Sequence, residues 1–168
     1  MGKVIRSLVL VAGLCAILGG LAFLPAQYVP PTPGATTLLA QGSLSSAQVL
    51  ALNGTPVTVI AAPGTGAVVI VEAFVSQLVY GGTAYVGSGT ITLVTDQGNS
   101  ITNGTGCVAA FLTATSNNFC YPTLASTTAN ASVNWVTRAI QLKMGTAQDT
   151  TGNGTISYWI TYHIQPGF

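Results

Sequence analysis

The residues that could carry acid–base chemistry are few and widely spaced. The chain has four basic and three acidic residues and one histidine, His163; the charged residues are Lys3, Arg6, Glu72, Asp96, Arg138, Lys143 and Asp149. General acid–base catalysis needs positioned titratable groups. A serine–histidine–acid triad would have to use His163, for which a surface or interface position is the favoured interpretation. We therefore predict that the chain is not an enzyme and has no catalytic residue.

The residues that could bind a metal ion are equally sparse. Cys107, Cys120 and His163 do not have the spacing of a zinc site. The loop from Asp149 to Asn153 carries oxygen atoms but lacks the further carboxylates of a calcium loop, so a plain hairpin turn is favoured. We predict no metal site and no bound cofactor.

Two cysteines outside the N-terminal segment could form a disulfide. Cys107 and Cys120 are separated by 12 residues. In an exported domain, a disulfide between them would stabilise the fold by about 3 kcal/mol through loop closure. In a domain that matures in the cytosol, two buried free thiols are the alternative. Both interpretations fit the sequence.

Four asparagines lie in the N-glycosylation pattern Asn-x-Ser/Thr, and three of them belong to Asn-Gly-Thr triplets; the four are Asn53, Asn103, Asn130 and Asn153. In each triplet, Asn-Gly is expected to supply a residue with positive φ for a turn. We favour this turn interpretation, because the pattern matters for glycosylation only in a host that glycosylates exported proteins.

The aromatic residues offer a further binding chemistry. Trp159 and His163 fall on the polar side of an alternating segment, where they could contact another subunit or stack against a glycan. Aromatic side chains in β domains are more often packed, which is the alternative for this pair.

The composition excludes several classes of protein. Nucleic-acid binding needs clustered Lys and Arg, which the chain lacks, so we predict no nucleic-acid partner. Disorder is excluded because the chain is 49% hydrophobic and 4% charged. Soluble monomers carry about 25% charged residues, so this surface must consist of neutral polar groups. Such a surface favours a subunit covered by its neighbours, in a homo-oligomer or a larger assembly, or a subunit coated with glycan.

The first residues have the pattern of a targeting segment. Lys3 and Arg6 precede an apolar run from Leu8 to Leu24, and Pro25 ends it. This order is typical of a signal peptide, and an uncleaved membrane anchor is the alternative. We predict a hydrophobic signal or anchor helix over residues 1–26, a proline-rich and polar linker over 27–42, and one domain over 43–168. The first segment would be the contact with a membrane.

The rest of the chain favours strands. Ser45 and Gln48 form a capping-box pattern, which predicts one short helix over residues 45–52. Strands are predicted over residues 56–61, 67–79, 89–95, 106–114, 133–144 and 154–165, each bounded by Gly, Asn, Pro or Ser clusters. The last strand alternates clearly between apolar and polar residues, and it is a candidate edge strand for pairing between subunits. The stretch 67–75 is almost continuously apolar, which predicts cover on both sides. These patterns indicate an all-β fold, an antiparallel sandwich or jelly roll.

Several short motifs resemble small proteins encoded in tailed-phage genomes. Residues 49–64 read VLALNGTPVTVIAAPG, which is similar to the opening of those proteins: a short helix, an Ala-Leu-Asn-x-Thr-Pro-Val strand and an Ala-Pro-Gly turn. Similar pieces follow in the same order at residues 80–85, 109–112 and 151–156, and in a final strand ending Tyr162-His163-Ile164. The motifs are turn and strand signatures, and no active site comes with them.

The resemblance implies a β-sandwich protein of the virion, a capsid decoration or fibre-like subunit that associates with itself and with other virion proteins. The expected location is the virion surface. An exported cell-surface or extracellular fibre subunit with the same sandwich is the alternative that accounts for the apolar first residues, and a carbohydrate-binding module is a third.

Overall fold

The computed structural model describes residues 36–102, 106–124, 136–145 and 147–167. The predicted signal or anchor segment, 1–26, lies outside the described residues, as does the predicted linker up to residue 35. Asn103 and Asn130 also lie outside them. Within the described ranges, no helix has the length and apolar character needed to cross a membrane.

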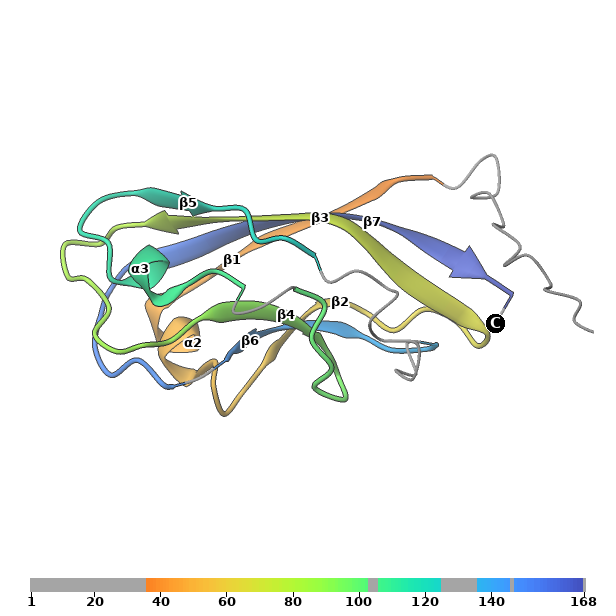
Figure 1. Ribbon diagram of the computed structural model, residues 1–168, viewed down its shortest axis with the longest axis horizontal. Coiled ribbons are helices and arrows are strands. Elements are labelled where there is room, and N and C mark those ends of the chain that lie inside the picture. The colour runs from red at the N-terminus through yellow and green to blue at the C-terminus, as the bar shows by residue number, and fades with distance from the viewer. Residues whose placement is uncertain (1–35, 103–105, 125–135, 146, 168) are drawn as a thin grey trace, which may run out of the picture. The chain divides into compact units, whose positions relative to one another are not determined.

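Two antiparallel sheets form the domain, one layer on the other (Figure 1). The first sheet has four strands in the order β1-β7-β3-β5, and the second has three in the order β2-β6-β4. The strands of the first sheet are β1 (Leu38–Leu44), β7 (Thr155–Pro166), β3 (Ala67–Val79) and β5 (Asn118–Cys120). Those of the second are β2 (Val57–Ile60), β6 (Ile140–Met144) and β4 (Ile91–Thr95). The predicted all-β antiparallel sandwich is confirmed.

The alternation of β7 places one of its faces in the core. Ile156 and Ile160 are fully buried between the layers, whereas Trp159 and Thr161 are on the opposite face and are partly exposed. Period-two alternation is what a strand covered on one side requires. The predicted range 154–165 is therefore correct within one residue at each end, and the range 67–79 predicted for β3 matches it fully.

The short helix α2 (Ser46–Ala51) begins at the predicted capping box. The Ser45 side chain accepts a hydrogen bond from the Gln48 backbone N–H, and the Gln48 side chain accepts one from the Ser45 backbone N–H at 2.9 Å. Val49 and Leu52 are buried at the end of the sandwich. The capping hydrogen bonds and the spacing of the apolar residues therefore both favour this helix.

Three predicted ranges differ from the structure. The range 106–114 contains helix α3 (Ala109–Leu112) in place of a strand. Only Cys107 of that range pairs with a neighbouring strand, exchanging two backbone hydrogen bonds with Ile91 of β4. Gly106, at φ 66°, turns the chain there. The predicted linker 27–42 ends too late, because β1 begins at Leu38. Of the range 133–144, residues 133–135 lie outside the described residues, and among 136–144 the strand is β6, from Ile140 onward.

Two expectations about individual strands were also wrong. β7 lies in the middle of its sheet, between β1 and β3, and so is not an edge strand. β3 is covered on both sides only at its start, where Ala67, Val68 and Val69 are all buried; further along, Phe74 is buried whereas Ala73 and Val79 are exposed. Strand β4 is the one buried along its whole length. The apolar run in β3 therefore combines a start that is buried on both faces with a later part in which Ala73 is exposed.

Candidate association surface

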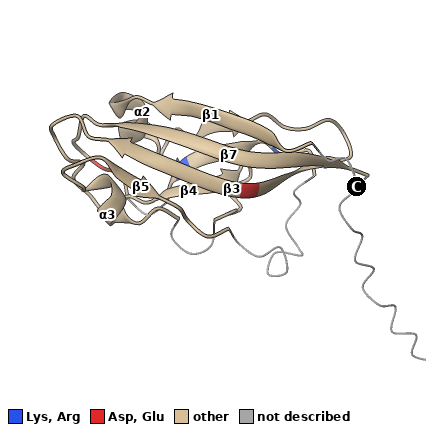
Figure 2. Ribbon diagram, turned by 90° about the horizontal axis from the view of Figure 1, so that it is seen from above, with Lys and Arg blue, Asp and Glu red and all other residues tan. Residues whose placement is uncertain are grey.

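The surface of the four-stranded sheet that faces away from the second sheet is the candidate site. We call it the outer sheet face. No described helix or strand lies over it (Figure 2). It is built from alternate residues of all four strands, of which the most relevant are Leu39, Gln41, Val75, Gln77, Phe119 and Trp159.

The strand register places these side chains in rows across the sheet. Trp159 on β7 lies directly between Gln41 on β1 and Val75 on β3. Gln77 on β3 lies opposite Phe119 on β5. Directly opposite residues share a face and interact, so each row brings apolar side chains next to an amide side chain. Leu39 is 55% exposed and Phe119 is 51% exposed. Water therefore meets large apolar groups on this face.

Charge is almost absent from the outer sheet face. Glu72 is the one charged residue in the four strands of this sheet, and it is the extra residue at a register shift in β3. Its Oε1 lies 2.9 Å from Nδ1 of His163 on β7, and its Oε2 accepts a hydrogen bond from the Thr37 hydroxyl at 3.4 Å. The predicted interface residue His163 is thus already paired within the subunit. Trp159 remains partly exposed, with no charged neighbour in its row.

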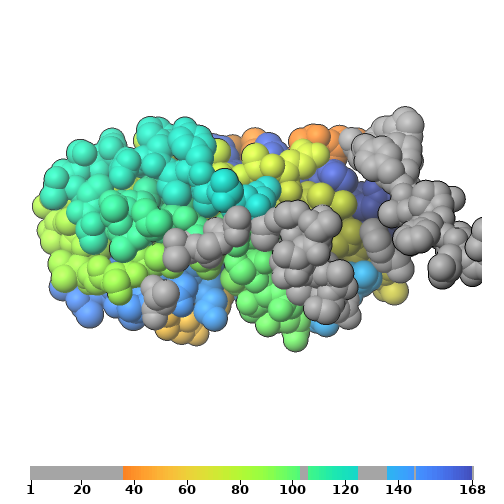
Figure 3. Space-filling view, in the orientation of Figure 1, coloured from red at the N-terminus to blue at the C-terminus, as the bar shows by residue number. Residues whose placement is uncertain are grey.

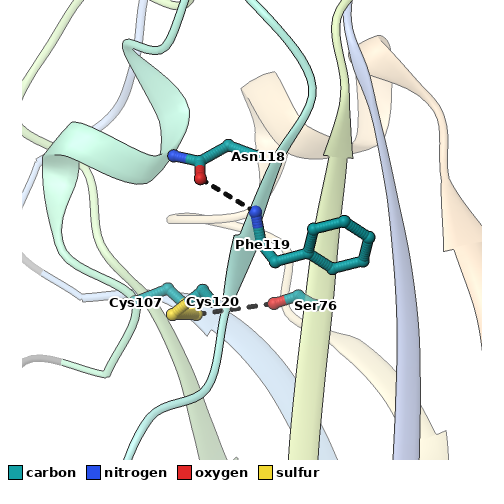
Figure 4. Close-up of a disulfide and its surroundings, with 5 residues drawn as sticks. All are labelled: Ser76, Cys107, Asn118, Phe119 and Cys120. Carbon is teal, nitrogen blue, oxygen red and sulfur yellow. Dashed lines mark hydrogen bonds between the residues drawn. A yellow bond between two sulfur atoms is a disulfide. The ribbon is translucent and has the colours of Figure 1, made fainter.

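A disulfide anchors the β5 side of the outer sheet face. Cys107 and Cys120 are bonded, with their Cα atoms 5.7 Å apart (Figure 4). Phe119 and Tyr121 flank Cys120, and their ring centroids are 6.4 Å apart with planes inclined by 19°. Tyr121 is 69% exposed. In the space-filling view, residues 106–124 (teal) form a large part of the visible surface at this end of the domain (Figure 3). This aromatic pair was not predicted, although its spacing of two around a cysteine was a usable signal.

The edges of the two sheets differ in how well they are closed. The edge of β4 that faces away from β6 is hydrogen-bonded to Cys107 and to residues 99–101. For example, the Ile101 N–H donates to the Leu93 carbonyl at 2.8 Å. β2 has four residues and a register shift. β5 has three, and its Phe119 N–H donates to the Asn118 side chain at 2.9 Å (Figure 4). β1 has seven residues and pairs in unbroken register with β7 alone among the described strands.

A carboxyl group is buried at one end of the sandwich, away from the outer sheet face. Asp149 is 2% exposed, and its Oδ1 accepts a hydrogen bond from the Gly89 N–H at 3.2 Å. Its Oδ2 has no hydrogen-bond partner in the described part of the chain. Burial raises the pKa of Asp149, and the Gly89 hydrogen bond opposes this.

Burial first, and the charge of Asp149 second, raise the pKa of Tyr85 to about 12. The Tyr85 hydroxyl donates to the Gly154 carbonyl at 2.6 Å. Tyr85 and Asp149 thus hold the loops before β4 and β7 in place. Across the described ranges, no three His, Cys, Asp or Glu side chains lie close enough to hold a metal ion.

The side chains of the two described asparagines of the glycosylation pattern each bond to the backbone of another segment. The Asn53 side chain donates to the Met144 carbonyl at 3.3 Å, and the Asn153 side chain accepts from the Thr83 N–H at 2.9 Å. Neither Gly54 nor Gly154 has a positive φ, contrary to expectation; near Asn153 the left-handed residue is Gly152, at φ 130°. Whether either asparagine carries a glycan stays a prediction.

The fold and this surface together define a two-layer antiparallel β-sandwich with a nearly uncharged sheet face that no described helix or strand covers. The sequence matches no protein-family profile, and no curated protein matches it. Among solved structures, the chain is similar to one from the capsid asymmetric unit of cyanophage Pam1, with 14% identity and a TM-score of 0.48, over 87% of this chain and 99% of that one. At these values we assign no family and take no function from the likeness.

Proposed function

We propose that this protein is a non-catalytic structural subunit of a virion, a capsid decoration or fibre-like protein that works by associating with copies of itself and with other virion proteins. The observation that carries self-association is the outer sheet face, which exposes apolar side chains with almost no charge. The placement in a virion rests on the resemblance of residues 49–64 and the later motifs to tailed-phage proteins.

Association through such a surface has a low desolvation cost. Moving a charged group out of water is expensive, whereas amide and hydroxyl groups cost less and can pair across an interface. Covering exposed apolar groups such as Leu39 and Phe119 gains roughly 25 cal/mol for each Å² removed from water. Of the described charges, Arg138 and Lys143 oppose three carboxylates, so copies repel one another weakly.

Sedimentation velocity on the purified chain over a range of concentrations tests self-association. We expect a species larger than the monomer, and its amount should change little between low and high salt because few charges take part. A monomer at every concentration, which also fails to cross-link on intact particles, would contradict the proposal. Mass spectrometry of purified particles tests the virion assignment, since an exported cell-surface subunit would be absent from them.

Residues 1–26 carry the remaining part of this proposal, a signal or membrane anchor. A chain that begins at Gln27 should then stay folded and soluble, because the strands and the core begin at Leu38. Circular dichroism of this shortened chain is the measurement. Loss of β-structure that returns only when residues 1–26 are present would show that the segment belongs to the fold.

A carbohydrate-binding module is a second candidate, favoured by the exposed Phe119 and Tyr121 pair. Near-parallel aromatic rings on a rigid strand can stack against the apolar faces of sugar rings. Binding on a glycan array that disappears in Tyr121→Ala, but persists in the control Val86→Ala, would support this function. Val86 is a suitable control because it is 60% exposed and its backbone pairs with Thr151, not with β5. Absence of any binding would leave the structural role.

A further inference from the structure

We propose that β1 of one subunit pairs antiparallel with β1 of a second copy, about a two-fold axis at Gln41, so that two four-stranded sheets join into one. This inference rests on the proposed self-association and adds a second contact between the same copies. It concerns the backbone edge of the sheet, which is distinct from the side chains of the outer sheet face.

β1 is the edge that lacks the usual protection against pairing. Natural edge strands are kept short, interrupted by bulges, or given proline or charged residues, because unpaired backbone groups attract another strand. β1 is seven residues long, has no register shift, and contains neither proline nor a charged residue. In the described part of the chain each of the other three edges carries at least one such protection: bonded neighbours on β4, a shift in β2, and three-residue length in β5.

A second copy fits this edge because β1 is complementary to itself. With Gln41 opposite Gln41 of the partner, Leu39 lies opposite Ser43 and Ala40 lies opposite Gly42, so each outer-face residue meets an outer-face residue. No charge on either strand opposes the contact. A two-fold contact uses the same patch on both subunits. The β1 patch meets this requirement, because its outer-face residues lie opposite outer-face residues of the second copy.

The preceding residues of the same chain are a poor alternative partner. Pro30, Pro31 and Pro33 lie just before β1 in the sequence. Proline has no backbone N–H and so cannot donate to a strand ladder. A regular antiparallel partner therefore has to come from outside this segment, and the neutral β1 of a second copy supplies one.

The contact is small, which sets what the experiment should show. Seven residues at about 3.4 Å each span roughly 24 Å of edge. A single pair of strands buries less than the roughly 800 Å² per partner of a typical stable interface. We therefore expect a dimer that dissociates on dilution, and a trapping method is needed in addition to sedimentation.

Cysteine cross-linking of the full chain, with Cys15→Ser to remove the thiol outside the domain, tests the register. Opposite Cα atoms in an antiparallel pair are about 4.5 to 5.5 Å apart, which a disulfide can bridge. Gln41→Cys should therefore give a disulfide-linked dimer on mild oxidation. Thr58→Cys on the β2 edge, which is also exposed, is the control and should stay monomeric.

A mixture of Leu39→Cys and Ser43→Cys chains extends the test, because these positions lie opposite each other only in the proposed register. The mixed dimer should exceed either homodimer. Gln41→Lys should weaken the dimer at least tenfold, with partial recovery at high salt, because it places like charges opposite each other. If the chain associates but none of the β1 cysteines cross-links as described, this inference is wrong and the proposed function stands. If the chain does not associate at all, both are wrong.

Discussion

Cys107 and Cys120 join the two layers of the sandwich to each other. Cys120 belongs to β5 of the four-stranded sheet, whereas Cys107 is hydrogen-bonded to Ile91 of β4 in the three-stranded sheet. The Ser76 hydroxyl on β3, directly opposite Cys120, lies 3.4 Å from the Cys107 sulfur. The disulfide therefore holds the layers together at the end where the aromatic pair is exposed.

Loss of this disulfide should lower stability without changing the fold. A bond across 13 residues of sequence separation stabilises by roughly 3 kcal/mol. We expect the Cys107→Ser, Cys120→Ser double variant to unfold about 10 °C below the parent chain. Thermal unfolding by circular dichroism measures this, and intact mass with and without reduction shows whether the bond forms. Two free thiols in the unreduced, natively located protein would contradict the prediction.

Ile160 should be among the most sensitive positions of the core. It is fully buried in the middle of β7, which pairs on both sides. Ile160→Ala leaves a cavity in a closely packed interior, so we expect a loss of about 2 to 5 kcal/mol in the free energy of unfolding. Thr161→Ala, the next residue on the partly exposed face, is the control and should cost much less. Urea denaturation of both variants gives the comparison, and equal losses would show that this core assignment is wrong.

Asp149 should make the domain less stable as pH rises. Its folded-state pKa is raised by burial above the ordinary value of 3.8. Between these two pKa values the folded state binds more protons than the unfolded state, so the free energy of unfolding falls with increasing pH across that window. Asp149→Asn should remove this slope and should be more stable than the parent above the window.

Unfolding measurements from pH 3 to pH 8 test the Asp149 prediction. Asp96→Asn is the matched control, because Asp96 is partly exposed and its Oδ1 lies 4.0 Å from Arg138. The control should retain the fall in stability with pH. An unchanged pH profile in Asp149→Asn would show that the buried carboxyl does not titrate in this range.

The capping box of α2 should contribute a small, local stability. Ser45→Ala removes the hydroxyl that accepts the Gln48 N–H, so we expect a loss of about 1 kcal/mol. Ser43→Ala, in the exposed part of β1, should be close to neutral. Chemical denaturation of the two variants is sufficient to separate them, and a larger cost at Ser43 would reverse the assignment.

Local sequence patterns predicted those helices and strands whose hydrophobic and capping pattern matches their burial in the fold. The alternation of β7, the long apolar run of β3 and the capping box of α2 all gave elements close to their observed ranges. Short apolar runs are ambiguous between strand and helix, which explains why α3 was predicted as a strand. β1 was missed because it follows prolines and alternates only weakly between apolar and polar residues. β5 was missed because it has three residues.

The candidate site was predictable only in part. Trp159 was identified from alternation alone, but its significance depends on which strands lie beside β7. Strand order depends on tertiary pairing, which local patterns do not show. In the observed order β7 is a central strand and β1 is an edge strand, contrary to the expectation that β7 is an edge. The pairing of His163 with Glu72 depends on a register shift in β3 that no local signal announces.

The antiparallel pairing of β1 with β7 also determines how the domain responds to mechanical force. Leu38 lies opposite Tyr162 and Leu44 lies opposite Ile156, so the start of β1 and the end of β7 are at the same end of the sheet. A pulling force applied at Leu38 and Pro166 therefore loads the hydrogen bonds one pair after another, as in opening a zipper. We expect β1 to peel away at low force in single-molecule pulling, and a single high-force rupture would show that the strands are loaded in shear.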